Sequence, residues 1–199
     1  VFFHLEDYLK AIKDYTVALK LEPDNLEFIS NLAVAYWRNH DYEQAASHYT
    51  SALEKDPNNI SILIGRGSVY YDSGDYDRCI ADCDRVITLD EKNTSGYINR
   101  AKASFALQHY TEAQVDFEKA KSISSDENNL IAAGLAICSF VLGRKDEAKS
   151  LWNELLAKDE QYRDITWVEK ELHWAKPLSL VATQLIAEMP DNKGAESLK

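Results

Sequence analysis

Apolar residues recur along most of the chain at steps of three and four positions, with charged and polar residues between them. This pattern is typical of α-helices that bury one face, because side chains three and four positions apart lie on the same side of a helix. Short turns separate successive stretches of this kind. The pattern therefore predicts an all-α chain built of paired helices.

The helix pairs recur with a period of 34 residues, and four tyrosines mark it at constant spacing: Tyr8, Tyr42, Tyr76 and Tyr110. Pro23 and Pro57 are also 34 residues apart, in turns where a proline stops one helix and an asparagine can cap the next. Several residue types in one register indicate an array of stacked repeats.

These residues resemble the tetratricopeptide repeat (TPR) family, in which the second helix of each repeat carries an alanine, an aromatic residue and a closing proline. The match is best in residues 26–59, where the expected residues are Ile29, Leu32, Ala33, Tyr36, Ala45, Tyr49, Ala52 and Pro57. The resemblance covers about residues 1–162. It implies a right-handed α-solenoid of helix-turn-helix repeats with C-terminal capping helices.

Residues 1–162 are expected to form about five helix pairs, the first of them incomplete. The four complete pairs are expected at about 26–59, 60–93, 94–128 and 129–162. Residues 163–189 are expected to supply the capping helices, because a repeat array must cover its last apolar face. The polar residues 190–199 are expected to be a flexible tail.

The fifth pair carries an apolar strip on its first helix, formed by Leu130, Ala133, Ile137, Phe140 and Val141. An open apolar surface of that size is either an aggregation hazard or a binding site. The preferred interpretation is that the capping helices cover the strip. The alternative is that it binds a helix of a partner.

Two arginines, Arg66 and Arg100, stand where the repeat expects leucine. The aliphatic part of an arginine can pack in a core while its charged end reaches water. Both guanidinium groups are therefore expected at the edge of the array.

The chain has a formal net charge of −11, which repels nucleic acids and anionic membrane surfaces on average. A nucleic-acid partner is therefore not expected. Insertion into a membrane is not expected either, because the longest uncharged stretch, Asn128 to Gly143, is too short to span a bilayer. Three cysteines are too few for a disulfide scaffold and favour a reducing, cytoplasmic location.

Cys79 and Cys83 lie four residues apart at core positions of a second helix, and a metal site would need two more ligands beside them. Buried structural thiols are the expected role. The sequence contains no metalloprotease helix, phosphate-binding glycine loop or nucleophile elbow. Neither a metal ion nor a cofactor is expected, and the chain is predicted not to be an enzyme.

The resemblance implies a scaffold that binds a peptide or helix of a partner protein on a concave face lined by the first helices. One aromatic residue per repeat falls on this face: Phe3, Trp37, Tyr71, Phe105 and Phe140. These rings either contact the partner or pack between neighbouring helices, and Trp37 and Tyr71 are expected to be exposed. The full predicted site is Asn31, Trp37, Arg38, Ser68, Tyr71, Asp72, Asn99, Lys102 and Phe105.

Some TPR proteins grip the C-terminal carboxylate of a chaperone with lysine, arginine and asparagine side chains. The matching places in repeats two to four hold Glu27, Asn31, Gly65, Ser95 and Asn99, so the cations are missing and such a clamp is not expected. Two other functions stay open: a regulatory or substrate-recruiting region of a larger enzyme, and a self-associating structural module of undetermined oligomeric state.

Overall fold

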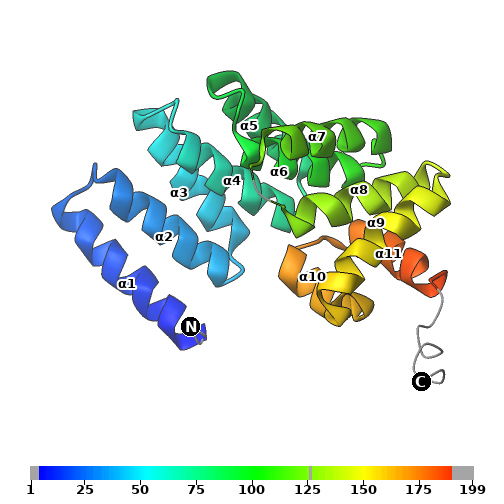
Figure 1. Cartoon of the computed structure of the whole chain (residues 1–199). Helices are drawn as coiled ribbons and strands as arrows, with labels where there is room; N and C mark the ends of the chain where they lie inside the picture. The colour runs from blue at the N-terminus through cyan, green and yellow to red at the C-terminus, as the bar shows by residue number, and fades with distance from the viewer. Residues whose placement is uncertain (1–4, 126, 190–199) are drawn as a thin grey trace. The chain divides into compact units, whose positions relative to one another are not determined.

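The computed structural model of the chain describes residues 5–125 and 127–189 (Figure 1). These residues form eleven α-helices and one short 3-10 helix, and no strand occurs among them. The prediction of an all-α fold is confirmed. Phe3 and the expected tail at residues 190–199 lie outside the described residues.

The helices follow one another along the chain with turns of a few residues between them. They are α1 (Leu5–Leu21), α2 (Leu26–Arg38), α3 (Tyr42–Lys55), α4 (Ile60–Ser73), α5 (Tyr76–Leu89), α6 (Thr94–Ala106), α7 (Tyr110–Ile123), α8 (Asn129–Val141), α9 (Lys145–Lys158), η1 (Glu160–Arg163), α10 (Ile165–Leu172) and α11 (Lys176–Ala187). The chain divides into two compact units within α6, unit 1 ending at Ala103 and unit 2 beginning at Ser104.

An asparagine begins the first helix of every complete pair. The side-chain oxygens of Asn25, Asn59 and Asn93 accept hydrogen bonds of 3.0–3.2 Å from the backbone N–H three residues later. Asn128 does the same for α8, at 2.9 and 3.3 Å to two successive N–H groups. Because these N–H groups have no partner inside the helix, each asparagine fixes where its helix starts.

The turn inside each pair needs one residue with a positive φ. Gly74 fills this position between α4 and α5 with a φ of 82°, and the next residue, Asp75, caps α5 through Arg78 N–H at 3.2 Å. His40 and Gln108 take the same place one repeat earlier and later, with φ values of 61° and 66°. The residues Ser73-Gly74-Asp75 thus end α4 and start α5.

The core of unit 1 depends on close approach of helices at small residues. Ala33 and Ala45 are fully buried where α2 and α3 meet. Tyr49 of α3 lies against Gly65 of α4 so closely that a Cβ atom at Gly65 would lie 2.7 Å from the tyrosine ring. The aromatic residue of one pair therefore requires a glycine in the next.

The guanidinium of Arg66 does not reach the edge of the array, contrary to expectation. Its side chain is 14% exposed and binds the carboxylate of Asp82, which is 3% exposed. Arg66 also donates to Thr50 Oγ1 at 3.0 Å. The expectation holds for Arg100, whose side chain is 27% exposed and pairs with the exposed Asp84. The difference arises because α5 presents a buried carboxylate to Arg66.

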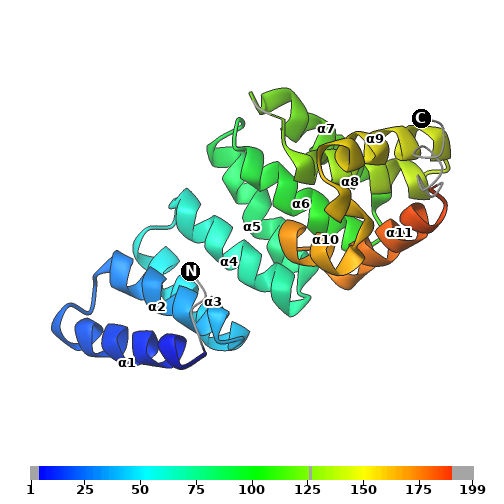
Figure 2. The same cartoon turned by 60° about the horizontal axis from the view of Figure 1, so that its bottom comes forward.

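In unit 2, α11 packs against α8, and α10 packs against α11 (Figures 1 and 2). In the apolar strip of α8, Ala133 and Ile137 are fully buried and Phe140 is 9% exposed. A fully buried Trp152 joins α9 to this region and donates from Nε1 to the carbonyl of Tyr162 at 3.2 Å. Helix α11 thus packs on the helix that carries the strip, and three of the five strip residues are buried.

Candidate partner-binding site

Three successive first helices of unit 1 present side chains to a common surface, which we call the first-helix face. It is formed by α2, α4 and residues 94–103 of α6. Trp37, Asp72 and Lys102 come from these three helices in turn. The predicted site residues on α2, α4 and α6 therefore lie in one unit, apart from Phe105, which belongs to unit 2.

Trp37 is held in place by Asp72. The indole Nε1 donates a hydrogen bond of 2.8 Å to Asp72 Oδ2, across 35 residues of sequence. The Arg38 guanidinium lies over the same indole, 4.9 Å from the ring centre. Trp37 is half-buried and Asp72 is exposed, so a large aromatic ring is fixed in one orientation at the surface.

Lys102 lies beneath this surface. Its side chain is 6% exposed, and its ammonium is 4.3 Å from the centre of the Tyr71 ring. Burial lowers the pKa of Lys102 to about 8, against the attraction of the Asp72 carboxylate. The ammonium is therefore a desolvated charge that lies over the Tyr71 ring of α4.

Asp72 also acts on two tyrosines at the turns. The pKa values of Tyr42 and Tyr76 are raised, first by partial burial and second by the negative charge of Asp72. The rings of Tyr71 and Tyr76 lie 5.7 Å apart. Asp72 is thus a carboxylate surrounded by aromatic side chains and neighbouring the buried ammonium.

Three predicted contact residues are buried instead of exposed. Tyr71 is 5% exposed, Lys102 is 6% and Phe105 is 1%, and the expectation that Tyr71 is exposed is wrong. Phe140, the last ring of the aromatic series, is also buried. These rings pack inside their units because the neighbouring helices cover them, so they support a surface instead of forming one.

The remaining predicted residues differ in their surroundings. Ser68 is half-buried and donates from Oγ to the carbonyl of Ile64 at 2.9 Å, and Asn99 is half-buried. Asn31 and Arg38 line a groove of about 560 Å³ between α1 and α2. The shape of this groove depends on which helices pack against α1, which a local sequence pattern does not specify.

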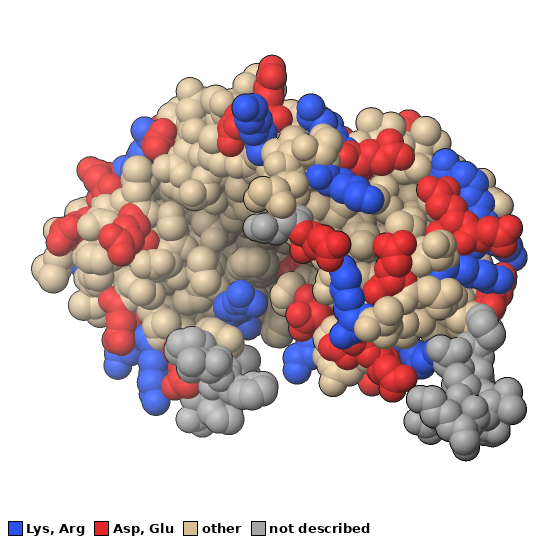
Figure 3. All heavy atoms as spheres, in the orientation of Figure 1, with Lys and Arg blue, Asp and Glu red and all other residues tan. Residues whose placement is uncertain are grey.

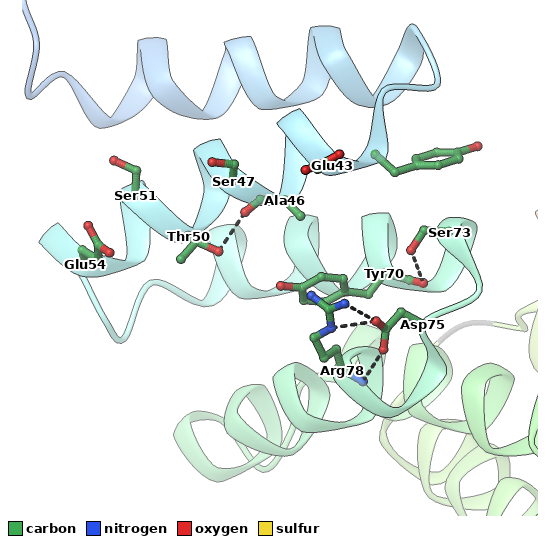
Figure 4. Close-up of a pocket in the computed structure, with 11 residues that line it drawn as sticks. Glu43, Ala46, Ser47, Thr50, Ser51, Glu54, Tyr70, Ser73, Asp75 and Arg78 are labelled. Carbon is green, nitrogen blue, oxygen red and sulfur yellow. Dashed lines mark hydrogen bonds and ion pairs between the residues drawn. The ribbon is translucent and has the colours of Figure 1, made fainter.

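A second groove, of about 640 Å³, lies in unit 1 between α3, α4 and the start of α5 (Figure 4). We call it the outer groove; Glu43, Ser47 and Glu54 line it from α3, and Tyr70 and Arg78 line it from α4 and α5. The Arg78 guanidinium lies 4.7 Å from the Tyr70 ring centre and pairs with Asp75. Two of the charged groups that line the outer groove, Asp75 and Arg78, are thus paired with each other.

The cysteines have the expected structural role, since Cys79, Cys83 and Cys138 are all buried and unpaired with one another by disulfides. A hydrogen bond to Cys79 and burial raise the pKa of Cys83, and burial raises that of Cys138 to about 12. Neutral buried thiols are poor nucleophiles. No cluster of three or more metal-binding side chains occurs among the described residues.

Acidic and basic side chains are interspersed on the face shown in Figure 3, and no continuous basic patch appears there among the residues described. This distribution agrees with the net charge of −11, which disfavours a polyanionic partner. No helix in the described part of the chain is long and apolar enough to cross a membrane.

Antiparallel helix pairs in series, joined by capped turns, define a helical-repeat protein. The chain belongs to the tetratricopeptide repeat family, because models of this repeat match residues 1–60, 30–96 and 94–127. The predicted resemblance is confirmed. No curated protein sequence matches the chain.

Solved structures of similar fold include other TPR proteins. The first TPR of Spaghetti (RPAP3) bound to the HSP90 peptide SRMEEVD is 25% identical, with a TM-score of 0.56, over 59% of this chain and 92% of that one. A TPR protein from Parabacteroides merdae is 22% identical, with a TM-score of 0.70, over 94% and 75%. MamA is 19% identical, with a TM-score of 0.70, over 81% and 98%. The last two likenesses show the fold alone.

Proposed function

We propose that the chain is a protein-interaction scaffold that holds a segment of a partner protein against the first-helix face of unit 1. The observation that carries the proposal is the Trp37 ring, half-buried and fixed by its hydrogen bond to Asp72. Aromatic residues held in one orientation dominate binding energies at protein interfaces, because little conformational entropy is lost when the partner docks.

The surroundings of Trp37 suit a peptide. Asp72 offers a carboxylate, and Ser68 offers a hydroxyl one turn before it on α4. Asn99 of α6 offers an amide. A large ring flanked by such polar groups provides both apolar contact and hydrogen bonds for an extended segment or a helix. The RPAP3 repeat of similar fold binds a peptide, which supports the class of ligand.

The acidic C-terminal peptide of that relative is not the expected ligand here. Glu27, Gly65 and Ser95 stand at three places where carboxylate-binding TPR domains carry cationic or amide side chains. Without cations, a terminal carboxylate would lose its hydration and gain no charged partner. We therefore expect the peptide SRMEEVD to bind this chain no better than a scrambled peptide.

The proposal is tested by partner capture followed by measured affinity. The partner isolated from a lysate of the source organism is purified, and its binding to the chain is measured by isothermal titration calorimetry. Trp37→Ala should weaken binding by about 30-fold, roughly 2 kcal/mol, as expected for an aromatic anchor. Asp72→Asn should weaken it less, because the indole keeps a hydrogen-bond acceptor.

Matched controls come from the outer groove. Ser47→Ala and Glu54→Ala change exposed or partly exposed side chains of the same unit. They should leave affinity unchanged. If these substitutions weaken binding and Trp37→Ala does not, the partner docks on the outer groove and the proposed face is wrong.

A further inference from the structure

The buried ammonium of Lys102 has no partner of opposite charge. Its side chain is 6% exposed, and the ammonium lies 4.3 Å from the centre of the Tyr71 ring. Among the residues that the structure describes, Lys102 forms neither an ion pair nor a hydrogen bond. A charge that loses its water without gaining a counter-ion is costly, so Lys102 destabilises the free chain. A group of this kind on a candidate binding face points to a missing ligand.

Asp72 is the carboxylate that acts on Lys102, yet it does not pair with the ammonium. Its negative charge attracts Lys102 through space. At the same time Asp72 Oδ2 accepts the indole N–H of Trp37 at 2.8 Å. This hydrogen bond fixes the carboxylate beside the indole and thus leaves the lysine unpaired.

The ammonium is largely buried but not fully covered. Within the described chain, the side-chain nitrogen and oxygen atoms that are fully covered and lack a hydrogen bond are Ser139 Oγ and Trp174 Nε1. Nζ of Lys102 also lacks a hydrogen bond but is not one of them, so it still meets solvent. The Tyr71 ring covers one side of the ammonium, and the N–H groups on the other side can donate to an incoming acceptor.

The charged groups near the Trp37 anchor favour an anionic ligand. The first-helix face carries Arg38 and Asp72 at the ends of α2 and α4, and α6 adds Lys102. Neither of the two cations forms an ion pair with a residue that the structure describes, whereas the one carboxylate is held by the indole. A local excess of positive charge therefore lies on a chain whose formal net charge is −11, and its complement is a negative group.

We propose that the first-helix face recognises an acidic side chain of the partner, a glutamate or aspartate whose carboxylate pairs with Nζ of Lys102. The inference rests on the proposed function, since it names the partner's chemistry at the same face. Asn99 is half-buried one turn before Lys102 on α6, so its amide can donate a second hydrogen bond to that carboxylate. Charge-assisted hydrogen bonds gain strength where water is partly excluded, as it is beside the Tyr71 ring.

The recognised group is a side-chain carboxylate and not the end of a chain. The places where carboxylate-binding TPR domains carry cationic or amide side chains hold Glu27, Gly65 and Ser95 here, and Lys102 is at none of them. A single ammonium matches a single carboxylate. The nearby Asp72 repels a doubly charged phosphate group more strongly than a carboxylate, because the repulsion grows with the charge of the ligand.

The test begins with selection of short random peptides on the full chain. The peptides are displayed on phage through their C-terminal ends, so that no free terminal carboxylate is present. Selection on the unmodified chain should enrich glutamate or aspartate at one shared position. Selection on Lys102→Met should not, because methionine keeps an apolar side chain of similar length and removes the charge.

Affinities of a selected peptide then measure the charge pair. The peptide and a twin with glutamine in place of the glutamate are made with amidated C-termini, and fluorescence anisotropy gives their dissociation constants. The glutamine twin should bind about tenfold more weakly to the unmodified chain and equally well to Lys102→Met. Lys92→Met is the matched control: it removes an exposed lysine of the same unit and should keep the preference. Circular dichroism verifies that both variants are folded.

Three results would overturn the inference: equal binding of the two peptides to the unmodified chain, a preference that survives in Lys102→Met, or tighter binding of a third peptide with phosphoserine at that position. Selected peptides that Trp37→Ala weakens but that show no acidic preference would refute this inference alone. If no selected peptide depends on Trp37, the proposed function fails, and the inference fails with it.

Discussion

The carboxylate of Asp82 binds the guanidinium of Arg66 through two hydrogen bonds, 2.8 Å from Nε and 2.6 Å from Nη2. The pair joins α4 to α5 inside unit 1, at a place where the repeat usually has an apolar contact. The hydrogen bond to Asp82 raises the pKa of Arg66 above its ordinary value. Both groups are shielded from water, so each depends on the other.

Asp82→Ala should therefore lower the free energy of unfolding by about 3 kcal/mol, because it leaves a buried guanidinium without its partner. Urea denaturation followed by circular dichroism measures the loss. Adding Arg66→Leu to this variant should recover most of it, since the repeat accepts an apolar residue there. The exposed pair Arg100 and Asp84 is the control, and Asp84→Asn should cost at most about 1 kcal/mol. Equal losses at the two pairs would contradict the assigned difference in burial.

Two glycines of α4 should respond in opposite ways to alanine. A Cβ atom at Gly65 would lie 2.7 Å from the Tyr49 ring, whereas one at Gly67 has its nearest neighbour at 3.6 Å. Alanine normally stabilises a helix interior by about 1 kcal/mol relative to glycine. Gly67→Ala should therefore stabilise the chain, and Gly65→Ala should destabilise it by about 1–3 kcal/mol through overpacking.

A double variant identifies the cause at Gly65. Tyr49→Cys gives α3 the residue that α5 has at the equivalent position, Cys83. Because the smaller side chain leaves room for a Cβ atom, Gly65→Ala should no longer destabilise in that background. If the two substitutions prove additive in thermal melts, the tyrosine ring is not what restricts this position.

Lys102 should make unit 1 more stable as the pH rises through a defined window. Burial lowers its pKa to about 8 in the folded chain, from about 10.5 in the unfolded chain. Below pH 8 the ammonium is charged in both states and its desolvation cost is fully present. Between these two values the unfolded chain binds more protons, so the free energy of unfolding should rise by up to about 3 kcal/mol.

The Lys102→Met variant isolates this effect from the ionisation of other groups in the chain. It should be more stable than the unmodified chain at pH 7, and the difference should shrink as the pH rises from 8 to 10.5. Chemical denaturation at four or five pH values measures it. If the free energies of unfolding of the variant and of the unmodified chain differ by the same amount at every pH, the ammonium is not desolvated in the folded chain.

The capping role of α11 can be tested by substituting two of its leucines, one buried and one exposed. Leu185 is fully buried, whereas Leu180 on the same helix is 61% exposed. Leu185→Asp should detach α11 and uncover the apolar strip of α8, increasing binding of the dye ANS and promoting aggregation. Leu180→Asp should do neither. Unchanged dye binding in both variants would show that another element protects the strip.

The sequence by itself determined the helices and where they begin. The period of 34 residues places the starts of α2, α4 and α6 at Leu26, Ile60 and Thr94, where the helices are found. Helix periodicity, asparagine caps and turn residues such as Gly74 act between residues a few positions apart. Their effect can therefore be predicted from the order of residues alone.

Only the tertiary structure decided which members of a repeated position face water. Trp37 and Tyr71 occupy equivalent positions, yet one is half-buried and held by Asp72 while the other is covered and carries the ammonium of Lys102. Arg66 and Arg100 differ in the same way. Burial and pairing depend on side chains that adjacent helices contribute from 16 to 35 residues away, and a local sequence pattern contains no record of how those helices pack.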